Sequence, residues 1–144
     1  MKQKKFKLFS EFTYDFHVYG IISKVKEFTL SWGINSVSNI ELSKEDDLII
    51  DMKGGNEKAV SNYKYTTDIL DVHLFKNQLD NSKNLDNKYF IPTLQNFDYL
   101  LKIDFEDDSY LIDELFMHIR KSNKIESILK LDINKIKEKE FFLF

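Results

Sequence analysis

The sequence predicts an α+β fold, with a mainly antiparallel β-sheet and one or two helices packed against it, in a single domain that spans 1–144. Two observations predict this class. Apolar and polar residues alternate with a period of two along much of the chain, which is typical of strands. The predicted strands mostly follow one another instead of alternating with helices, which favours antiparallel pairing. The ends, 1–9 and 133–144, are expected to be attached more loosely than the rest.

The alternation begins near the N-terminus. Apolar side chains occupy most even positions from Phe6 to Ile22, a span that is too long for one ordinary strand. We place the first strand at 14–22 and expect the residues before it to form a second strand or an extended arm. The remaining predicted strands cover 48–52, 60–67, 70–74, 97–105 and 125–131, and those at 60–67 and 70–74 form a hairpin. Polar loops are predicted at 53–59 and 76–89.

The strand at 97–105 has the clearest pattern. One predicted face carries Phe97, Tyr99, Leu101, Ile103 and Phe105, and the other carries Asp98, Leu100, Lys102 and Asp104. Pro92 lies shortly before the strand, which suits a residue that lacks the N–H needed within a ladder. We expect Tyr99 to be anchored in the core with its hydroxyl at a hydrogen-bond partner. Asp98 is expected to point outward or toward a helix cap.

A helix is predicted over 109–121. Ser109 suits the N-cap position, and the acidic Asp113 and Glu114 follow early, where the helix dipole favours negative charge. The basic Lys121 lies at the opposite end. An apolar stripe at helical spacing is formed by Leu111, Ile112, Leu115, Phe116 and Ile119.

Residues 26–38 fit two structures. Their apolar side chains alternate as in a strand, at Phe28, Leu30, Trp32 and Ile34. In a helix, Val25, Phe28 and Trp32 would share one face, and Leu30, Ile34 and Val37 another. We favour the helix, and its two apolar faces predict that it is sandwiched between two layers.

Composition excludes several classes of site. The chain has no cysteine, which excludes disulfides, a thiol nucleophile and zinc sites built on thiolates. Its formal net charge of −3 argues against nonspecific binding of polyanions. Among 21 basic residues only Arg120 is an arginine, so a bidentate clamp on phosphate or carboxylate has one guanidinium available. Neither a targeting signal nor a run of 18 apolar residues is visible, so we expect a cytoplasmic protein without a membrane partner.

Motifs for metal binding and catalysis fail one by one. The three histidines lie far apart and lack metal-ligand spacing. The acidic run at 104–108 fails the EF-hand pattern, because Ser109 stands at its sixth position and Leu115 at its twelfth. Phosphate-binding glycine loops and serine-nucleophile motifs are absent. We therefore predict no metal, no cofactor and no catalytic residue, and we lean against an enzyme without excluding one.

Two aromatic features remain as candidate contacts. Tyr63-Lys64-Tyr65, together with a basic arm at Lys2, Lys4, Lys5 and Lys7, resembles the stacking surfaces that bind single-stranded RNA. Aromatic side chains on an alternating strand face the core more often than solvent, and we favour that interpretation. The chain also ends on Phe141-Phe142-Leu143-Phe144. We expect this tail to dock on its own domain, with a partner or second subunit as the alternative.

The segment Ile91-Pro92-Thr93-Leu94-Gln95-Asn96-Phe97-Asp98-Tyr99 resembles the signature of the IPExxxVDY family, small proteins of the Bacteroidetes group. The similarity covers 14–105 and includes Tyr19-Gly20-Ile21, Glu27-Phe28-Thr29-Leu30-Ser31-Trp32, Asn35, Asp46-Asp47-Leu48, Tyr63-Lys64-Tyr65 and Leu100-Leu101. It implies a cytosolic bacterial protein whose biochemical role is unassigned. Thr93 departs from the pattern's Glu and Phe97 from its Val, so a mechanism that needs an acid at position 93 would be missing.

The leading hypothesis is a non-enzymatic module that binds another protein or associates with itself as a homodimer. The first alternative is an RNA-associated accessory protein that uses strand aromatics and lysines. A weaker alternative is a small-ligand binder or enzyme with a deep pocket near Trp32 and Asp98. The candidate binding residues are Trp32, Asn35, Tyr63, Lys64, Tyr65, Asp98, Tyr99, Phe141, Phe142 and Phe144.

Overall fold

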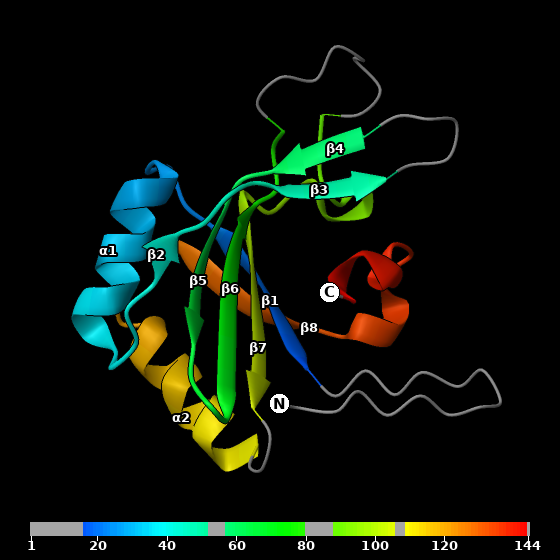
Figure 1. The fold of residues 1–144 in the computed structure, drawn as a ribbon. Helices are drawn as coiled ribbons and strands as arrows, with labels where there is room; N and C mark the ends of the chain where they lie inside the picture. The colour runs from blue at the N-terminus through cyan, green and yellow to red at the C-terminus, as the bar shows by residue number, and fades with distance from the viewer. Residues whose placement is uncertain (1–15, 52–56, 80–87, 106–108, 144) are drawn as a thin grey trace, which may run out of the picture.

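The computed structural model describes residues 16–51, 57–79, 88–105 and 109–143 (Figure 1). Its main sheet has six strands in the order β2-β5-β6-β7-β1-β8, and every neighbouring pair is antiparallel. These strands are β1 (His17–Ile22), β2 (Ser43–Lys44), β5 (Asn62–Thr66), β6 (Leu70–Lys76), β7 (Tyr99–Phe105) and β8 (Ser127–Leu131). A separate hairpin pairs β3 (Leu48–Asp51) with β4 (Glu57–Val60). The predicted α+β class with a mainly antiparallel sheet is confirmed.

Two helices, α1 (Glu27–Val37) and α2 (Ser109–Ile119), cover one face of the main sheet (Figure 1). The core on this side buries Leu30 and Ile34 of α1, Ile112 and Ile119 of α2, and Tyr19, Val72, Leu74, Leu101 and Ile103 of the strands. The apolar stripe predicted the helix and most of its buried face, since Ile112, Leu115, Phe116 and Ile119 pack in this core, whereas Leu111 is 40% exposed.

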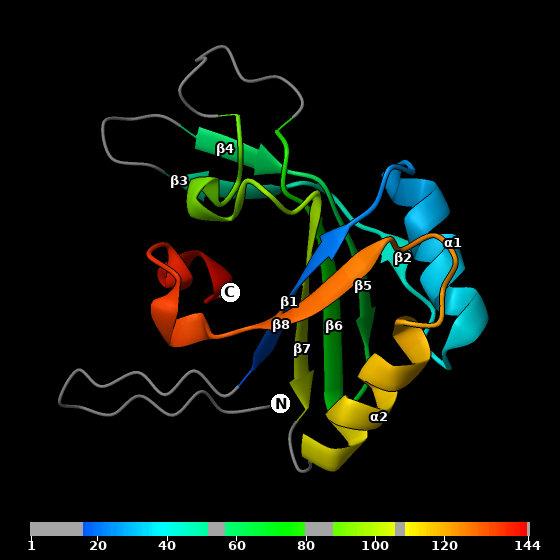
Figure 2. The same cartoon turned by 180° about the vertical axis from the view of Figure 1, so that it is seen from behind.

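The opposite face of the sheet is covered by C-terminal residues and by the segment that precedes β7 (Figure 2). Three short 3-10 helices belong to this layer, η2 (Pro92–Leu94), η3 (Ile133–Lys135) and η4 (Lys139–Phe142). Its core is mainly aromatic and contains Phe16, Phe75, Phe90 and Phe142. Because both faces of the sheet are covered, the central strand β7 is buried along nearly its whole length.

The helix favoured for 26–38 is present, but the expected sandwich is wrong. Leu30 and Ile34 face the sheet and are fully buried, whereas Phe28 is 70% exposed and Trp32 is 60% exposed. These two aromatic side chains lie four residues apart, so they share the outward face of α1. No second layer of the described residues covers them.

The predicted start of the strand at 97–105 is also wrong. The chain makes a 3-10 turn at η2 and enters β7 only at Tyr99. Phe97 therefore does not share a face with Tyr99, and packs with the core on the opposite side of the sheet. The irregular backbone before β7 breaks the alternation on which the prediction depended.

The loop predicted over 53–59 is shorter than expected, because β4 begins at Glu57 and pairs with β3. Its pattern was obscured by a lysine on the inward face. Lys58 is only 3% exposed, and its Nζ donates hydrogen bonds to the backbone oxygens of Tyr89 (2.9 Å) and Phe90 (3.1 Å). Burial lowers the pKa of this amine. The two-residue strand β2 carried no periodic signal and was not predicted.

The described part of the C-terminal tail, 133–143, packs on its own domain, as expected for the terminal aromatic residues, and we call it the C-terminal strap. The looser attachment expected for 133–144 is wrong for these residues, because Ile133, Ile136 and Phe142 are buried in the core. Phe142 is fully buried, and its backbone oxygen accepts a hydrogen bond from Nζ of the buried Lys102 (2.6 Å). Glu138 accepts hydrogen bonds from both the backbone N–H (3.1 Å) and the hydroxyl of Thr93. The strap is therefore anchored by side chains that lie far apart along the chain.

Several predictions fall on residues outside the described ranges. These are the arm at 1–9, the residues before 16 in the first strand, the part of the loop at 53–59 that precedes Glu57, most of the loop at 76–89, and Phe144. Within the ranges that the structure does describe, no helix is both long enough and apolar enough to cross a membrane.

Candidate binding cleft

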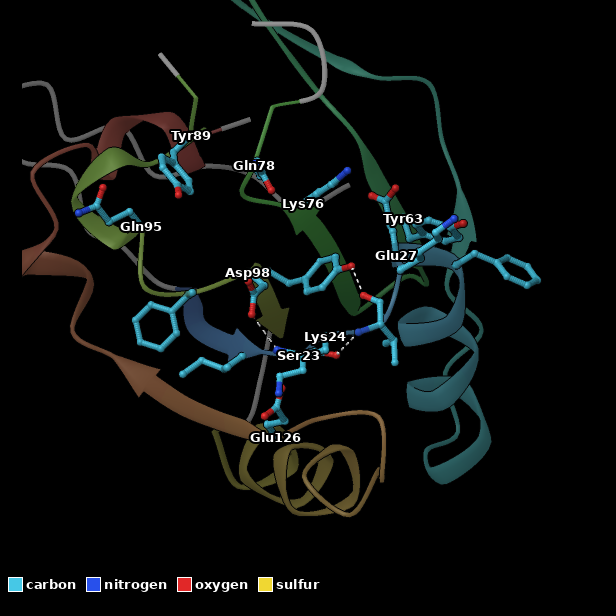
Figure 3. Close-up of a pocket in the computed structure, with 16 residues that line it drawn as sticks. Ser23, Lys24, Glu27, Tyr63, Lys76, Gln78, Tyr89, Gln95, Asp98 and Glu126 are labelled. Carbon is cyan, nitrogen blue, oxygen red and sulfur yellow. Dashed lines mark hydrogen bonds between the residues drawn. The ribbon is translucent and has the colours of Figure 1, made fainter. Parts of the chain in front are cut away.

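A cleft of about 900 Å³ lies at one end of the main sheet, where β1 and β6 end and where α1 and β7 begin (Figure 3). Tyr89 and Gln95 stand on one wall, and Glu27 and Tyr63 stand on the opposite wall. Asp98 lies between them. The cleft thus forms where four elements and the segment before β7 converge.

The floor of the cleft is built around Asp98. Its backbone N–H donates to the oxygen of Ile21 (2.9 Å), and its Oδ2 accepts a hydrogen bond from the backbone N–H of Ser23 (2.9 Å). Ser23 in turn donates from Oγ to the oxygen of Lys124 (2.5 Å). Asp98 therefore connects the end of β1 to the start of β7, while the side chain as a whole stays exposed.

Tyr99 has the structural role expected from the sequence. It is 4% exposed, and its hydroxyl donates a hydrogen bond to the oxygen of Val25 (2.6 Å). This contact holds the connection between β1 and α1 in place. The start of α1 is thereby positioned against the cleft.

Asn77 organises the wall opposite α1, and sequence reasoning missed it. The side chain is fully buried. Its Nδ2 donates to the oxygens of Leu94 (3.0 Å) and Phe97 (3.1 Å), and its Oδ1 accepts from the N–H of Ile91 (2.9 Å). One amide thus holds the whole segment that leads into β7. An asparagine in a polar, asparagine-rich stretch carries no sequence signal for such a role.

The α1 wall contains an acid and an uncapped helix end. Glu27 Oε1 accepts a hydrogen bond from the hydroxyl of Ser61 (2.7 Å), and Glu27 Oε2 is buried without a hydrogen-bond partner. Lys26 occupies the N-cap position, where no side chain caps the first turn. The first hydrogen bond within the helix runs from Leu30 N–H to Lys26 O (2.9 Å). The preceding N–H groups therefore have no partner within the helix.

The residues Tyr63-Lys64-Tyr65 lie on β5, and their rings are not displayed as a stacking surface. Tyr63 is 8% exposed and belongs to the core beneath the helices, although it also reaches the cleft. Tyr65 is partly buried against the same core. Lys64 lies between the two tyrosines on the other face of the strand. In the register of β5 with β6, it stands opposite His73.

Trp32 and Asn35 are separated from Asp98. Both line a hollow of about 410 Å³ at the end of α1, and neither lines the larger cleft. The Asn35 side chain binds the backbone of Leu42, donating to its oxygen (3.1 Å) and accepting from its N–H (2.8 Å). Asn35 therefore has a structural role, whereas Trp32 is a displayed aromatic side chain.

The terminal aromatic candidates lie on the opposite side of the sheet from the helices. Phe142 is buried and Phe141 partly buried, with Phe141 stacked on Phe90 at 6.0 Å between ring centroids. These rings pack within the core that the C-terminal strap forms with the sheet. Phe144 lies outside the described residues.

The chemistry of the cleft is polar and balanced in charge. Only four of its 16 lining residues, Ile22, Val25, Phe28 and Phe97, have hydrocarbon side chains. Three lysines and three acids also line it, namely Lys24, Lys26, Lys76, Glu27, Asp98 and Glu126. No histidine contributes to the lining, and the described residues contain no group of three or more His, Asp or Glu that could hold a metal ion. The arrangement is suited to binding by hydrogen bonds and charge pairing.

Comparisons with known proteins gave no relative. No family model, no curated protein and no solved structure matches this chain.

Proposed function

We propose that this protein is a non-enzymatic binding module that captures a segment of another protein in the cleft at the end of the sheet. One observation carries the proposal. The cleft continues at its rim into the exposed face of α1, because Phe28 lines the cleft and Trp32 follows one turn later. Exposed aromatic side chains beside a recess are typical contact points for a partner.

The lining favours a polypeptide over a small apolar ligand. Small-molecule sites are mostly lined by apolar side chains and enclose most of the ligand. Here hydrocarbon side chains are the minority, and both signs of charge are present around the cleft. A peptide offers backbone donors and acceptors together with charged side chains, which complement such a lining.

The experiment is a selection of peptides on the immobilised full-length protein. A library of random dodecapeptides is displayed in two formats, with free C-termini and as internal segments. Selected peptides are then titrated against the wild type and against Phe28→Ala and Asp98→Lys. We expect enrichment in at least one format and a loss of affinity of about tenfold or more in each variant.

Leu129→Ala is the matched control. Leu129 is 54% exposed on β8 and does not line the cleft, so this variant should bind as the wild type does. Failure of both formats to enrich a sequence would reject the proposal, as would equal affinity of the wild type and Phe28→Ala. Light scattering on the free protein tests the homodimer: a dimer dissociated by Trp32→Ala would assign the α1 face to a second copy.

The RNA alternative depended on exposed aromatic rings at Tyr63 and Tyr65. Both side chains instead pack in or against the core. It stays a prediction, and titration with single-stranded RNA at two salt concentrations tests it, because binding through phosphate contacts weakens as salt rises.

We also propose a cytoplasmic location and kinship with the IPExxxVDY family. The family proposal depends on residues 91–99. Thr93 stands where the family pattern has Glu, and the carboxylate of Glu138, which accepts hydrogen bonds from Thr93, lies at this position instead.

A further inference from the structure

We propose that the outer edge of β8 pairs with the same edge of a second copy of this protein, so that the two main sheets join into one. The inference does not depend on the capture of a peptide in the cleft. Two features of the strand support it, an open edge and a pattern of charges that complements itself under two-fold symmetry.

The open edge follows from the order of the strands. β8 is the last strand of the main sheet, and β1 is its only neighbour among the described strands (Figure 2). Within the described residues, the backbone of Ser127–Leu131 forms hydrogen bonds with β1 alone. Every second N–H and C=O of β8 therefore points away from the sheet, where a further strand can pair with it.

The two edges of the sheet differ in what they offer. At the other edge β2 has only two residues, and a strand this short gives a partner little backbone to pair with. β8 has five residues and contains neither proline nor glycine. Its Leu129 is 54% exposed. An edge of this length with an exposed leucine is the kind that accepts a strand from another chain.

The charges on β8 favour a second copy as that chain. A two-fold axis makes the two strands antiparallel, and it passes beside a single residue because outward-pointing backbone groups occur on alternate residues. With the axis at Ile128, Glu126 stands opposite Lys130 of the second copy, and the same pair occurs again on the other side of the axis. Both side chains are exposed, and neither forms an ion pair with a described residue. The strands would thus gain two pairs of opposite charge.

The neighbouring registers bring like charges together instead. An axis at Leu129 would place Glu126 opposite Asp132 of the second copy. An axis at Ser127 or at Lys130 would place a lysine opposite a lysine. Like charges directly opposite each other destabilise a strand pair, so the charges select the register centred on Ile128.

Apolar contacts fit the same register. Ile128 stands opposite its own copy on the face that carries the helices, where it already packs against the core. On the other face the two Leu129 side chains become diagonal neighbours across the axis. Association would therefore cover a leucine that is largely exposed in the single chain.

Reversal of the charges tests the surface and its register together. Sedimentation velocity over a range of concentrations should show a reversible dimer of the full-length wild type. Lys130→Glu and Glu126→Lys should each weaken the dimer by about tenfold or more, because each turns both charge pairs into repulsions. The double variant restores opposite charges and should recover most of the affinity. Lys137→Glu makes the same charge change at an exposed residue outside β8 and should leave the dimer unchanged.

Cross-linking provides a second measurement. The chain has no cysteine, so Ile128→Cys introduces a single thiol that lies beside its own copy in the proposed register. Mild oxidation should convert this variant to a disulfide-linked dimer. Met117→Cys, at an exposed position on α2, is the control and should stay monomeric on a denaturing gel after the same treatment.

Four results would overturn the inference. The first is a wild type that stays monomeric at about 100 μM. The second is a dimer that Lys130→Glu leaves intact, and the third is a double variant no tighter than the single ones. The fourth is a dimer that Trp32→Ala dissociates, because the interface would then lie on α1. Peptide capture is measured separately, so a monomer that still binds selected peptides would reject this edge and leave the proposed function standing.

Discussion

The ring of Phe97 lies directly against Gly20. A Cβ atom added to Gly20 would lie 2.5 Å from Cδ1, 2.6 Å from Cγ and 2.7 Å from Cε1 of that ring. Such distances are far inside van der Waals contact, so β1 needs glycine at this position in order to accept the segment that leads into β7. The contact sets how closely that segment, and hence Asp98, approaches the end of the sheet.

Replacement of this glycine should therefore be costly. We expect Gly20→Ala to destabilise the protein by about 1–3 kcal/mol, because the added methyl group overpacks the site. Urea unfolding measures the loss. The double variant Gly20→Ala with Phe97→Val should lose less than the sum of the single variants, with a coupling of about 1 kcal/mol or more. Strict additivity would show that the two residues do not contact each other.

Asn77 should be among the most sensitive polar residues. Asn77→Ala leaves the buried oxygens of Leu94 and Phe97 and the N–H of Ile91 without their partner. Each unsatisfied buried group costs about 1–3 kcal/mol, so we expect a loss of about 3 kcal/mol or more in urea unfolding. Asn123→Ala, at an exposed position, is the control and should change stability by less than about 0.5 kcal/mol. Similar losses in both variants would contradict the proposed clamp.

The C-terminal strap should contribute to stability and not to association. Phe142→Ala should cost about 3–5 kcal/mol, since a fully buried ring is lost. Deletion of 141–144 should likewise lower the melting temperature while leaving the mass in solution unchanged. Calorimetry and light scattering measure the two effects. An unchanged melting temperature, or a change of oligomeric state on deletion, would show that the tail acts outside its own domain.

Acid should destabilise the protein through His73. Burial, with Lys64 and Lys102 nearby, lowers the pKa of His73 to about 3, against about 6.5 in an unfolded chain. Between pH 6.5 and pH 3, His73 therefore binds a proton in the unfolded state but not in the folded state. The free energy of unfolding is therefore not reduced by His73 above pH 6.5. It falls as the pH falls from 6.5 toward 3, by at most about 1.4 kcal/mol per pH unit.

Unfolding free energies at pH 7 and pH 5 test this. The wild type should lose about 2 kcal/mol more than His73→Gln between the two values. The control is His118→Gln, at an exposed position on α2, which should lose as much as the wild type. Equal losses in the wild type and His73→Gln would mean that His73 titrates normally in the fold.

The elements of this fold could be predicted because their signals are local. Period-two alternation located the strands that form the centre of the sheet, and the stripe from Leu111 to Ile119 located α2. Tyr99 was predicted as a core anchor with a bonded hydroxyl, and it is one. Failures occurred where the local pattern is broken, at Lys58, which is buried although it is charged, and at Phe97, which precedes its strand.

By itself the sequence determined the class of the fold, most of its elements and the exclusion of thiol chemistry. Only the tertiary structure decided which faces are covered, and therefore that Phe28 and Trp32 are displayed while Phe142 is buried. Periodicity records which residues share a face, but it does not record what covers that face. The cleft has the same origin, because its residues come from distant segments whose meeting depends on long-range contacts such as those of Asp98 with Ser23 and of Asn77 with Ile91.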